Sequence, residues 1–214
     1  SITTSATTDL QVNTYLNMSR TDSGTSTIGD LAIILLPGDT GNALSASNMN
    51  LTISGSVALS SQQLSQSNGI LTFKSAPSLD NSSSLNVSSG ELVLQNGGTV
   101  NASSLKLHAS VFKPTGTISV TNGGILTLNE TSSVVLQGGT TLNQAGAVNW
   151  PELDLGGKKL TLGSTVSSFT IEKAFTIANG ESLSSGSSDV NLSKTLTINN
   201  GGKLSSGSGD VQIS

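Results

Sequence analysis

The segment FTIANGESLSSGSSDVNL, residues 175–192, recurs at residues 196–213 as LTINNGGKLSSGSGDVQI. The two segments superimpose with an offset of 21 residues, which places Asp189 on Asp210. Repeats of this length are typical of solenoid proteins, in which each repeat forms one coil that stacks on its neighbours. We therefore interpret the chain as an array of stacked coils.

An acidic residue followed by an apolar, any and an apolar residue extends the repeat through the chain. The six acids that begin this pattern lie 21, 61, 61, 37 and 21 residues apart, and 61 residues is close to three coils. They are Asp9, Asp30, Glu91, Glu152, Asp189 and Asp210. The intervals predict about ten coils of roughly 20–21 residues in a single array over residues 1–214. The interval of 37 residues predicts an irregular coil around residues 143–175.

The pattern within each coil favours β-structure. In apolar-any-apolar segments such as Leu196–Ile198, both apolar side chains lie on one face of a strand, because side chains alternate along a strand. Asn-Gly and Gly-Gly pairs supply positive φ at low steric cost, so the chain can turn a tight corner. Three apolar-any-apolar segments in each coil predict a three-sided coil around a column of Leu, Ile and Val. The predicted fold is an all-β, right-handed parallel β-helix.

Two other folds fit the sequence less well. A leucine-rich repeat has a similar period, but its asparagine-and-leucine consensus with a helical half-turn is absent. A β-sandwich also consists of short strands joined by turns, but it would not produce coils in register at a constant offset.

The composition indicates an uncharged polar surface. Ser, Thr, Gly and Asn make up 106 of the 214 residues. Charged residues make up 10%, whereas about a quarter is usual in globular domains. The net charge is −4 and the nine lysines and arginines are scattered, which argues against nucleic-acid binding. The chain has no cysteine, which excludes disulfides and thiol nucleophiles. The strongest apolar run, residues 31–36, is too short to span a bilayer, so we expect no membrane insertion.

Few residues in the sequence are suited to catalysis. His108 is the single histidine, and we do not expect it to form a nucleophilic triad. Glycoside cleavage needs two acids about 5–10 Å apart. The candidate pairs are Glu152 with Asp154 and Asp189 with Asp210. The aromatic residues that usually line a carbohydrate cleft are nearly missing, so we predict no enzymatic activity, no catalytic residues and no cofactor.

Asp189 and Asp210 are also the candidates for a metal site. They would stack on adjacent coils, and calcium prefers several oxygen ligands. However, the glycine-aspartate nonapeptide of calcium-binding β-rolls is absent. We therefore predict no metal, with calcium at these two acids as the alternative.

Two further features concern aromatic and threonine residues. Trp150 and Tyr15 are the aromatic residues with a polar edge, and we expect Trp150 to be a buried plug that bridges two coils. Threonine recurs in the middle of apolar-any-apolar segments, where it would point outward. Because threonine is favoured in strands generally, we do not interpret these residues as a binding face. They are Thr52, Thr72, Thr127, Thr161, Thr170, Thr176 and Thr197.

Glycine corners followed by apolar residues occur in NGGTV at residues 96–100, QGGTTL at 137–142, NGGIL at 122–126 and NGGKL at 200–204. With the strands around them, these segments resemble the passenger domains of bacterial autotransporters and exported adhesins of the filamentous-haemagglutinin type. The resemblance covers nearly the whole chain. It implies export to the bacterial cell surface and a role in adhesion or scaffolding, and it assigns no catalytic residues.

Both ends of the chain lie within the repeat and lack the amphipathic cap with which solenoids cover a last coil. We therefore expect either neighbouring segments of a longer chain or end-to-end self-association into an open fibre. The expected function is a non-enzymatic extracellular structural or adhesive rod, either a surface adhesin passenger or a fibre-forming subunit. Its other expected partners are glycans or proteins of a host or cell surface. The alternative is a carbohydrate-active or carbohydrate-binding β-helix protein.

Overall fold

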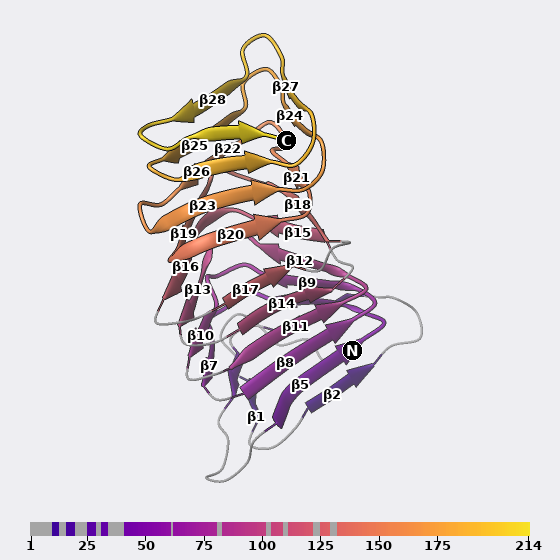
Figure 1. The fold of residues 1–214 in the computed structure, drawn as a ribbon. Coiled ribbons are helices and arrows are strands. Elements are labelled where there is room, and N and C mark those ends of the chain that lie inside the picture. The colour runs from indigo at the N-terminus through magenta and orange to yellow at the C-terminus, as the bar shows by residue number, and fades with distance from the viewer. Residues whose placement is uncertain are drawn as a thin grey trace.

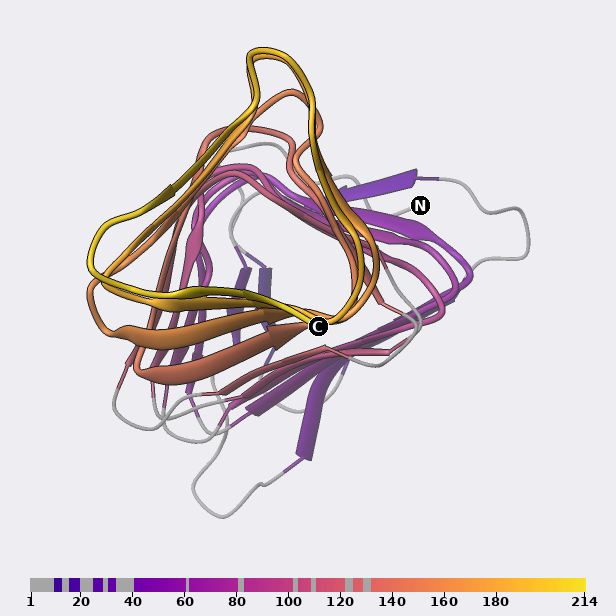
Figure 2. The same cartoon turned by 45° about the horizontal axis from the view of Figure 1, so that its top comes forward.

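The chain forms a solenoid of stacked coils with three strands each, as a computed structural model shows (Figure 1). Viewed closer to the axis, the coils enclose a three-sided core (Figure 2). Within a sheet, each strand pairs in parallel with the strands three places before and after it in the chain. The structure describes residues 10–12, 16–19, 25–28, 31–33, 41–60, 62–80, 83–101, 104–108, 111–121, 125–128 and 132–214.

The first side of the solenoid is a ten-stranded sheet, which receives one strand from each of ten coils. Its strands are β1 (Leu10–Val12), β4 (Leu31–Ile33), β7 (Val57–Ser60), β10 (Ser78–Asp80), β13 (Gly98–Asn101), β16 (Gly116–Thr121), β19 (Thr140–Gln144), β22 (Lys159–Leu162), β25 (Ser182–Gly186) and β28 (Lys203–Ser206).

The second strand of each coil belongs to a six-stranded sheet in the earlier coils and to a four-stranded sheet in the later ones. The six-stranded sheet contains β2 (Leu16–Ser19), β5 (Gly41–Ser47), β8 (Gln62–Ser67), β11 (Ser84–Ser88), β14 (Ser104–His108) and β17 (Ile125–Leu128). The four-stranded sheet contains β20 (Gly146–Trp150), β23 (Val166–Ile171), β26 (Asp189–Leu192) and β29 (Val211–Ile213).

The third strand of each coil belongs to a seven-stranded sheet and then to a two-stranded sheet. The seven-stranded sheet contains β3 (Thr25–Ile28), β6 (Asn50–Ile53), β9 (Ile70–Phe73), β12 (Glu91–Leu94), β15 (Val111–Pro114), β18 (Ser133–Val135) and β21 (Leu153–Asp154). The two-stranded sheet contains β24 (Phe175–Ile177) and β27 (Leu196–Ile198).

The strand registers confirm the repeat. Leu183 lies opposite Leu204 and Val190 lies opposite Val211, so the paired residues are 21 positions apart, as the aligned segments require. All pairs of strands in the described residues are parallel, and no helix occurs among them. The predicted all-β parallel β-helix is therefore confirmed.

The acidic signature does not mark one position of the coil, which corrects the interpretation of the sequence. Glu91 begins β12 and Glu152 directly precedes β21, both in the seven-stranded sheet. Asp189 begins β26 and Asp210 directly precedes β29, both in the four-stranded sheet. Two acids of the signature, Asp9 and Asp30, lie outside the described residues. The 37 residues from Glu152 to Asp189 therefore include a change of side, which the sequence could not show because all three sides have the same alternation.

Residues 143–175, where the sequence predicts an irregular coil, contain the change from one set of sheets to the other. The six-stranded sheet ends at β17 and the seven-stranded sheet ends at β21, whereas β20 and β24 begin the two smaller sheets. Val134 lies opposite Leu153, an offset of 19, and Leu160 lies opposite Leu183, an offset of 23. The ten-stranded sheet continues through this interval without a break.

The core consists of apolar columns that run along the axis. Full burial of one such side chain contributes roughly 1.5–3 kcal/mol, and the coils above and below provide that burial. Gln66 interrupts a neighbouring column between Ala46 and Val87, and its Nε2 donates to the Met49 carbonyl oxygen at 2.9 Å. One column of the seven-stranded sheet contains Leu51, Leu71, Leu92, Phe112, Val134 and Leu153, all buried.

Glycine occupies the corners for two separate reasons. Gly97 and Gly201 have φ values of 79° and 85°, which confirms that Asn-Gly corners use positive φ. Gly69 and Gly90 do not have positive φ, but each lies against a backbone carbonyl of the preceding coil. A Cβ at either position would lie closer than 3.0 Å to that carbonyl oxygen. Any side chain there would hold the two coils apart.

We expect Gly90→Ala to lower the free energy of unfolding by about 1–3 kcal/mol, because the new Cβ overlaps the Gly69 carbonyl oxygen. Gly139→Ala is the matched control. A Cβ at Gly139 has nothing within 4 Å, so the free energy should change by less than about 1 kcal/mol. Urea unfolding followed by circular dichroism measures both variants. Equal stability of the two would contradict the role of close coil contact.

Candidate functional site

The acids that the sequence offered as catalytic candidates lie on two different sides of the solenoid. Glu152 and Asp154 are at β21, whereas Asp189 and Asp210 are at β26 and β29. Glu152 Oε2 lies 2.6 Å from the Nζ of Lys173, and Asp154 Oδ1 accepts the Gly156 backbone N–H at 2.8 Å. The structure therefore brings the members of each pair onto one side but does not join the two pairs into one site.

Asp189 and Asp210 lie one coil apart and meet through a backbone contact. Asp189 Oδ1 accepts the backbone N–H of Asp210 at 2.9 Å, and both residues are exposed. This bond uses the carboxylate to tie one corner to the next. Among the described residues, no group of three or more His, Cys, Asp or Glu residues is arranged to hold a metal ion. Calcium at Asp189 and Asp210 stays a prediction.

The other residues singled out in the sequence have plain positions. His108 is the last residue of β14, opposite Ser88 of β11. Trp150 is buried, and its ring packs edge-on against Phe169 of the next coil with 5.1 Å between ring centroids. The expected coil-bridging plug is therefore confirmed. Tyr15 lies outside the described residues.

Glu181 is a buried acid that the sequence interpretation missed. It is 6% exposed, and its two carboxylate oxygens accept backbone N–H groups from Gly157 and Ala178, each at 2.7 Å. The side chain thus fastens a corner of its own coil to the corner of the coil before. A signal was present, because the 21-residue repeat places Gly202 at the position of Glu181. An acid that replaces a corner glycine indicates a local role.

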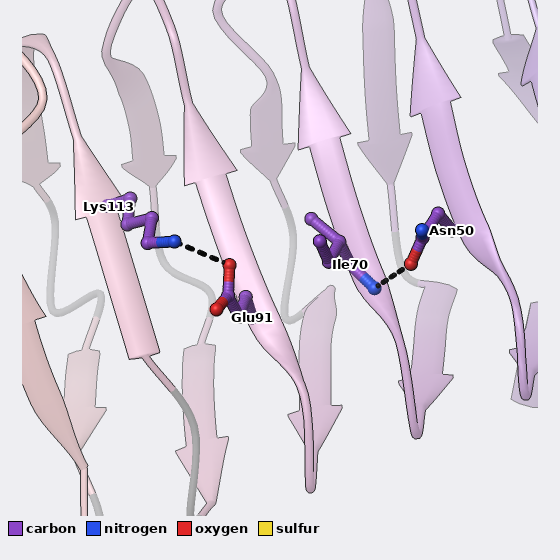
Figure 3. A network of polar contacts seen from close by, with 4 residues as sticks. All are labelled: Asn50, Ile70, Glu91 and Lys113. Carbon is purple, nitrogen blue, oxygen red and sulfur yellow. Dashed lines mark hydrogen bonds and ion pairs between the residues drawn. The ribbon is translucent and has the colours of Figure 1, made fainter. Parts of the chain in front are cut away.

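Ion pairs and amide bonds also connect successive coils on the outside of the seven-stranded sheet. Lys113 Nζ lies 2.7 Å from Glu91 Oε2, and the Asn50 side-chain oxygen accepts the Ile70 backbone N–H at 3.0 Å (Figure 3). Each partner comes from the neighbouring coil. Exposed ion pairs contribute at most about 1 kcal/mol each, so these contacts fix register more than they add stability.

The outer surface of the six-stranded sheet carries columns of small, uncharged polar side chains. We call this surface the hydroxyl-amide face. Along a column, neighbouring residues are about 4.8 Å apart, and the two columns are roughly two residues, or 6.6 Å, apart along the strands. The side chains alternate with buried ones, so they point outward and are partly exposed. The columns are Ser45, Ser65 and Asn86, and Ser47, Ser67 and Ser88.

The threonines do not form such a face. Thr52 lies opposite Thr72 in the seven-stranded sheet, and Thr176 lies opposite Thr197 in the two-stranded sheet. Thr161 is in the ten-stranded sheet, where its neighbour is Thr141. The recurring threonines are thus spread over several sides, in agreement with a general strand preference. The serine columns were missed because S-x-S has no distinctive spacing until the register of the strands is known.

Comparison with known proteins gives no relative. A scan against protein-family models, a search of curated proteins and a search of solved structures each find no match to this chain. Within the described ranges, no helix has the length and apolar character needed to cross a membrane. The functional interpretation therefore rests on the residues and their arrangement.

We expect Glu181→Ala to lower the free energy of unfolding by about 1–3 kcal/mol, because two backbone N–H groups lose a charged acceptor. The control is Glu152→Ala, which removes an exposed ion pair and should cost less than about 1 kcal/mol. Chemical denaturation of both variants at low and high salt gives the comparison. A Glu181→Ala variant as stable as the control would show that the carboxylate does not fasten the coils.

Proposed function

We propose that the chain is a non-enzymatic extracellular rod with a structural or adhesive role, similar to bacterial autotransporter passengers and filamentous-haemagglutinin-type adhesins. The observation that carries the proposal is the hydroxyl-amide face, a regular array of uncharged polar groups on stacked coils. The sequence resemblance and the parallel β-solenoid are compatible with it.

The physical properties of this face suit adhesion to a neutral surface. Hydroxyl and amide groups both donate and accept hydrogen bonds, so they can pair with glycan hydroxyls or with protein backbone without an opposite charge on the partner. Because the groups are fixed on paired strands, little side-chain entropy remains to be lost when a ligand binds. The columns also repeat along the axis, so several weak contacts can act together.

The alternative is a carbohydrate-active or carbohydrate-binding β-helix protein. The same face favours carbohydrate binding. For cleavage, the relevant residues are the acid pairs, Glu152 with Asp154 and Asp189 with Asp210. Each pair would have to work on its own side of the solenoid, and three of the four carboxylates already hold a local bond or ion pair.

We expect no product when the chain is incubated with a panel of neutral and acidic polysaccharides, assayed by reducing ends and by the absorbance of unsaturated sugars. The control is the variant with Glu152→Gln, Asp154→Asn, Asp189→Asn and Asp210→Asn, which should give the same result. Product formed by the unmodified chain and lost in the variant would establish the enzyme and overturn the non-enzymatic rod.

A rod built from nearest-neighbour contacts should tolerate the loss of one whole coil. Deletion of residues 70–90 joins Gly69 to Glu91 and preserves every register, because Ile70 lies opposite Glu91. We expect a folded protein that is shorter by about 4.8 Å in small-angle scattering. Deletion of residues 70–79 is the control, since it removes part of a coil and should abolish folding. If the whole-coil deletion also fails to fold, the coils do not behave as repeating units.

A further inference from the structure

The last coil exposes large apolar side chains that correspond to buried ones in the coil before. Ile198 is 47% exposed, Val211 38% and Ile213 59%, and they are the exposed large hydrophobic residues of the described chain. Figure 2 looks onto this coil, with the end of the chain beside the core. We call its free surface, formed by β27, β28 and β29, the terminal coil surface.

Each exposed residue continues a column of the core. Ile198 lies opposite Ile177, Val211 opposite Val190, and Ile213 opposite Leu192. These three partners are at most 1% exposed, because the last coil covers them. The terminal coil surface therefore offers to a partner what the preceding coil offers to the last one. Its complement is another coil with apolar-any-apolar strands in parallel register.

The strand edges point to the same partner. In the described residues, β27, β28 and β29 each pair with one strand only, as do β1, β2 and β3 at the opposite end. The first and last coils thus present edges of opposite direction along the axis, which is the relation that successive coils have inside the solenoid. The strands of the first coil include LQV (Leu10–Val12) and TSTI (Thr25–Ile28), so the partner edge belongs to a coil of the same type.

We propose that the terminal coil surface binds the first coil of a second copy of this 214-residue chain, so that β28, β29 and β27 pair with β1, β2 and β3 of that copy. This contact rests on the proposed rod function and extends it by naming the partner. It is heterologous, since one end binds the other end, so it does not close and produces chains of copies. Burial of the exposed apolar columns and pairing of the free edges drive it.

The first experiment measures mass against protein concentration by light scattering. The unmodified chain should form species at successive multiples of 21.5 kDa, and its average mass should rise more than two-fold. Val211→Lys with Ile213→Lys places charges in the apolar columns and should keep the chain at the monomer mass. Gln212→Lys, on the same strand but facing outward, is the control and should still assemble. A monomer at all concentrations, or equal assembly of both variants, would overturn the proposal.

The second experiment tests direction without disturbing the core. The chain has no cysteine, so Asn17→Cys with Gln212→Cys introduces one thiol on β2 and one on β29. Oxidation should give a ladder of covalent oligomers, whereas Gln212→Cys alone should stay monomeric on a denaturing gel. A covalent dimer of the single variant would show that two terminal coil surfaces face each other, which contradicts the proposal. Circular dichroism confirms that each variant is folded.

The two proposals fail in different ways. A chain that stays monomeric and cleaves no polysaccharide would overturn the stacking contact and leave the rod function intact. A chain that cleaves polysaccharide through its acids would overturn the non-enzymatic function whether or not copies stack.

Discussion

The short distance between parallel strands is the constraint on which the rest of this structure depends. Hydrogen bonding sets the coils about 4.8 Å apart, and every group that faces along the axis has to fit that distance. Corner glycines such as Gly69 and Gly90 lie where a carbonyl of the preceding coil leaves no room for a side chain. The same spacing stacks leucine on leucine in the core and brings Glu91 to Lys113 on the outside.

The sequence predicts the coil and its inner surface because these depend on short patterns that recur. The offset between Leu183 and Leu204, the apolar-any-apolar segments and the Asn-Gly corners all reappear in the structure. The side to which a strand belongs is harder to predict, because all three sides have the same alternation. For that reason the acids at Glu152 and Asp189 were assigned to one position although they lie on different sides.

The candidate site was less predictable than the fold, because it depends on register rather than pattern. Ser47, Ser67 and Ser88 are unremarkable serines in the sequence and become a column only when their strands are paired. Glu181 is an exception, since the repeat shows an acid where its copy has a glycine. The resulting picture separates two roles: leucine columns hold the coils together, and the uncharged outer columns are available for contact with a surface.

The direction of the hydrogen bonds has a mechanical consequence. In all five sheets the strands lie across the solenoid and pair with the coils before and after them, so the hydrogen bonds run along its length. A force that pulls the two ends apart therefore loads these bonds end-on and opens them a coil at a time, as a zip opens, rather than shearing many at once. Each released coil pays out roughly 70 Å of extended chain. Such a rod gives way in small steps under tension and regains its length by re-stacking the freed coils.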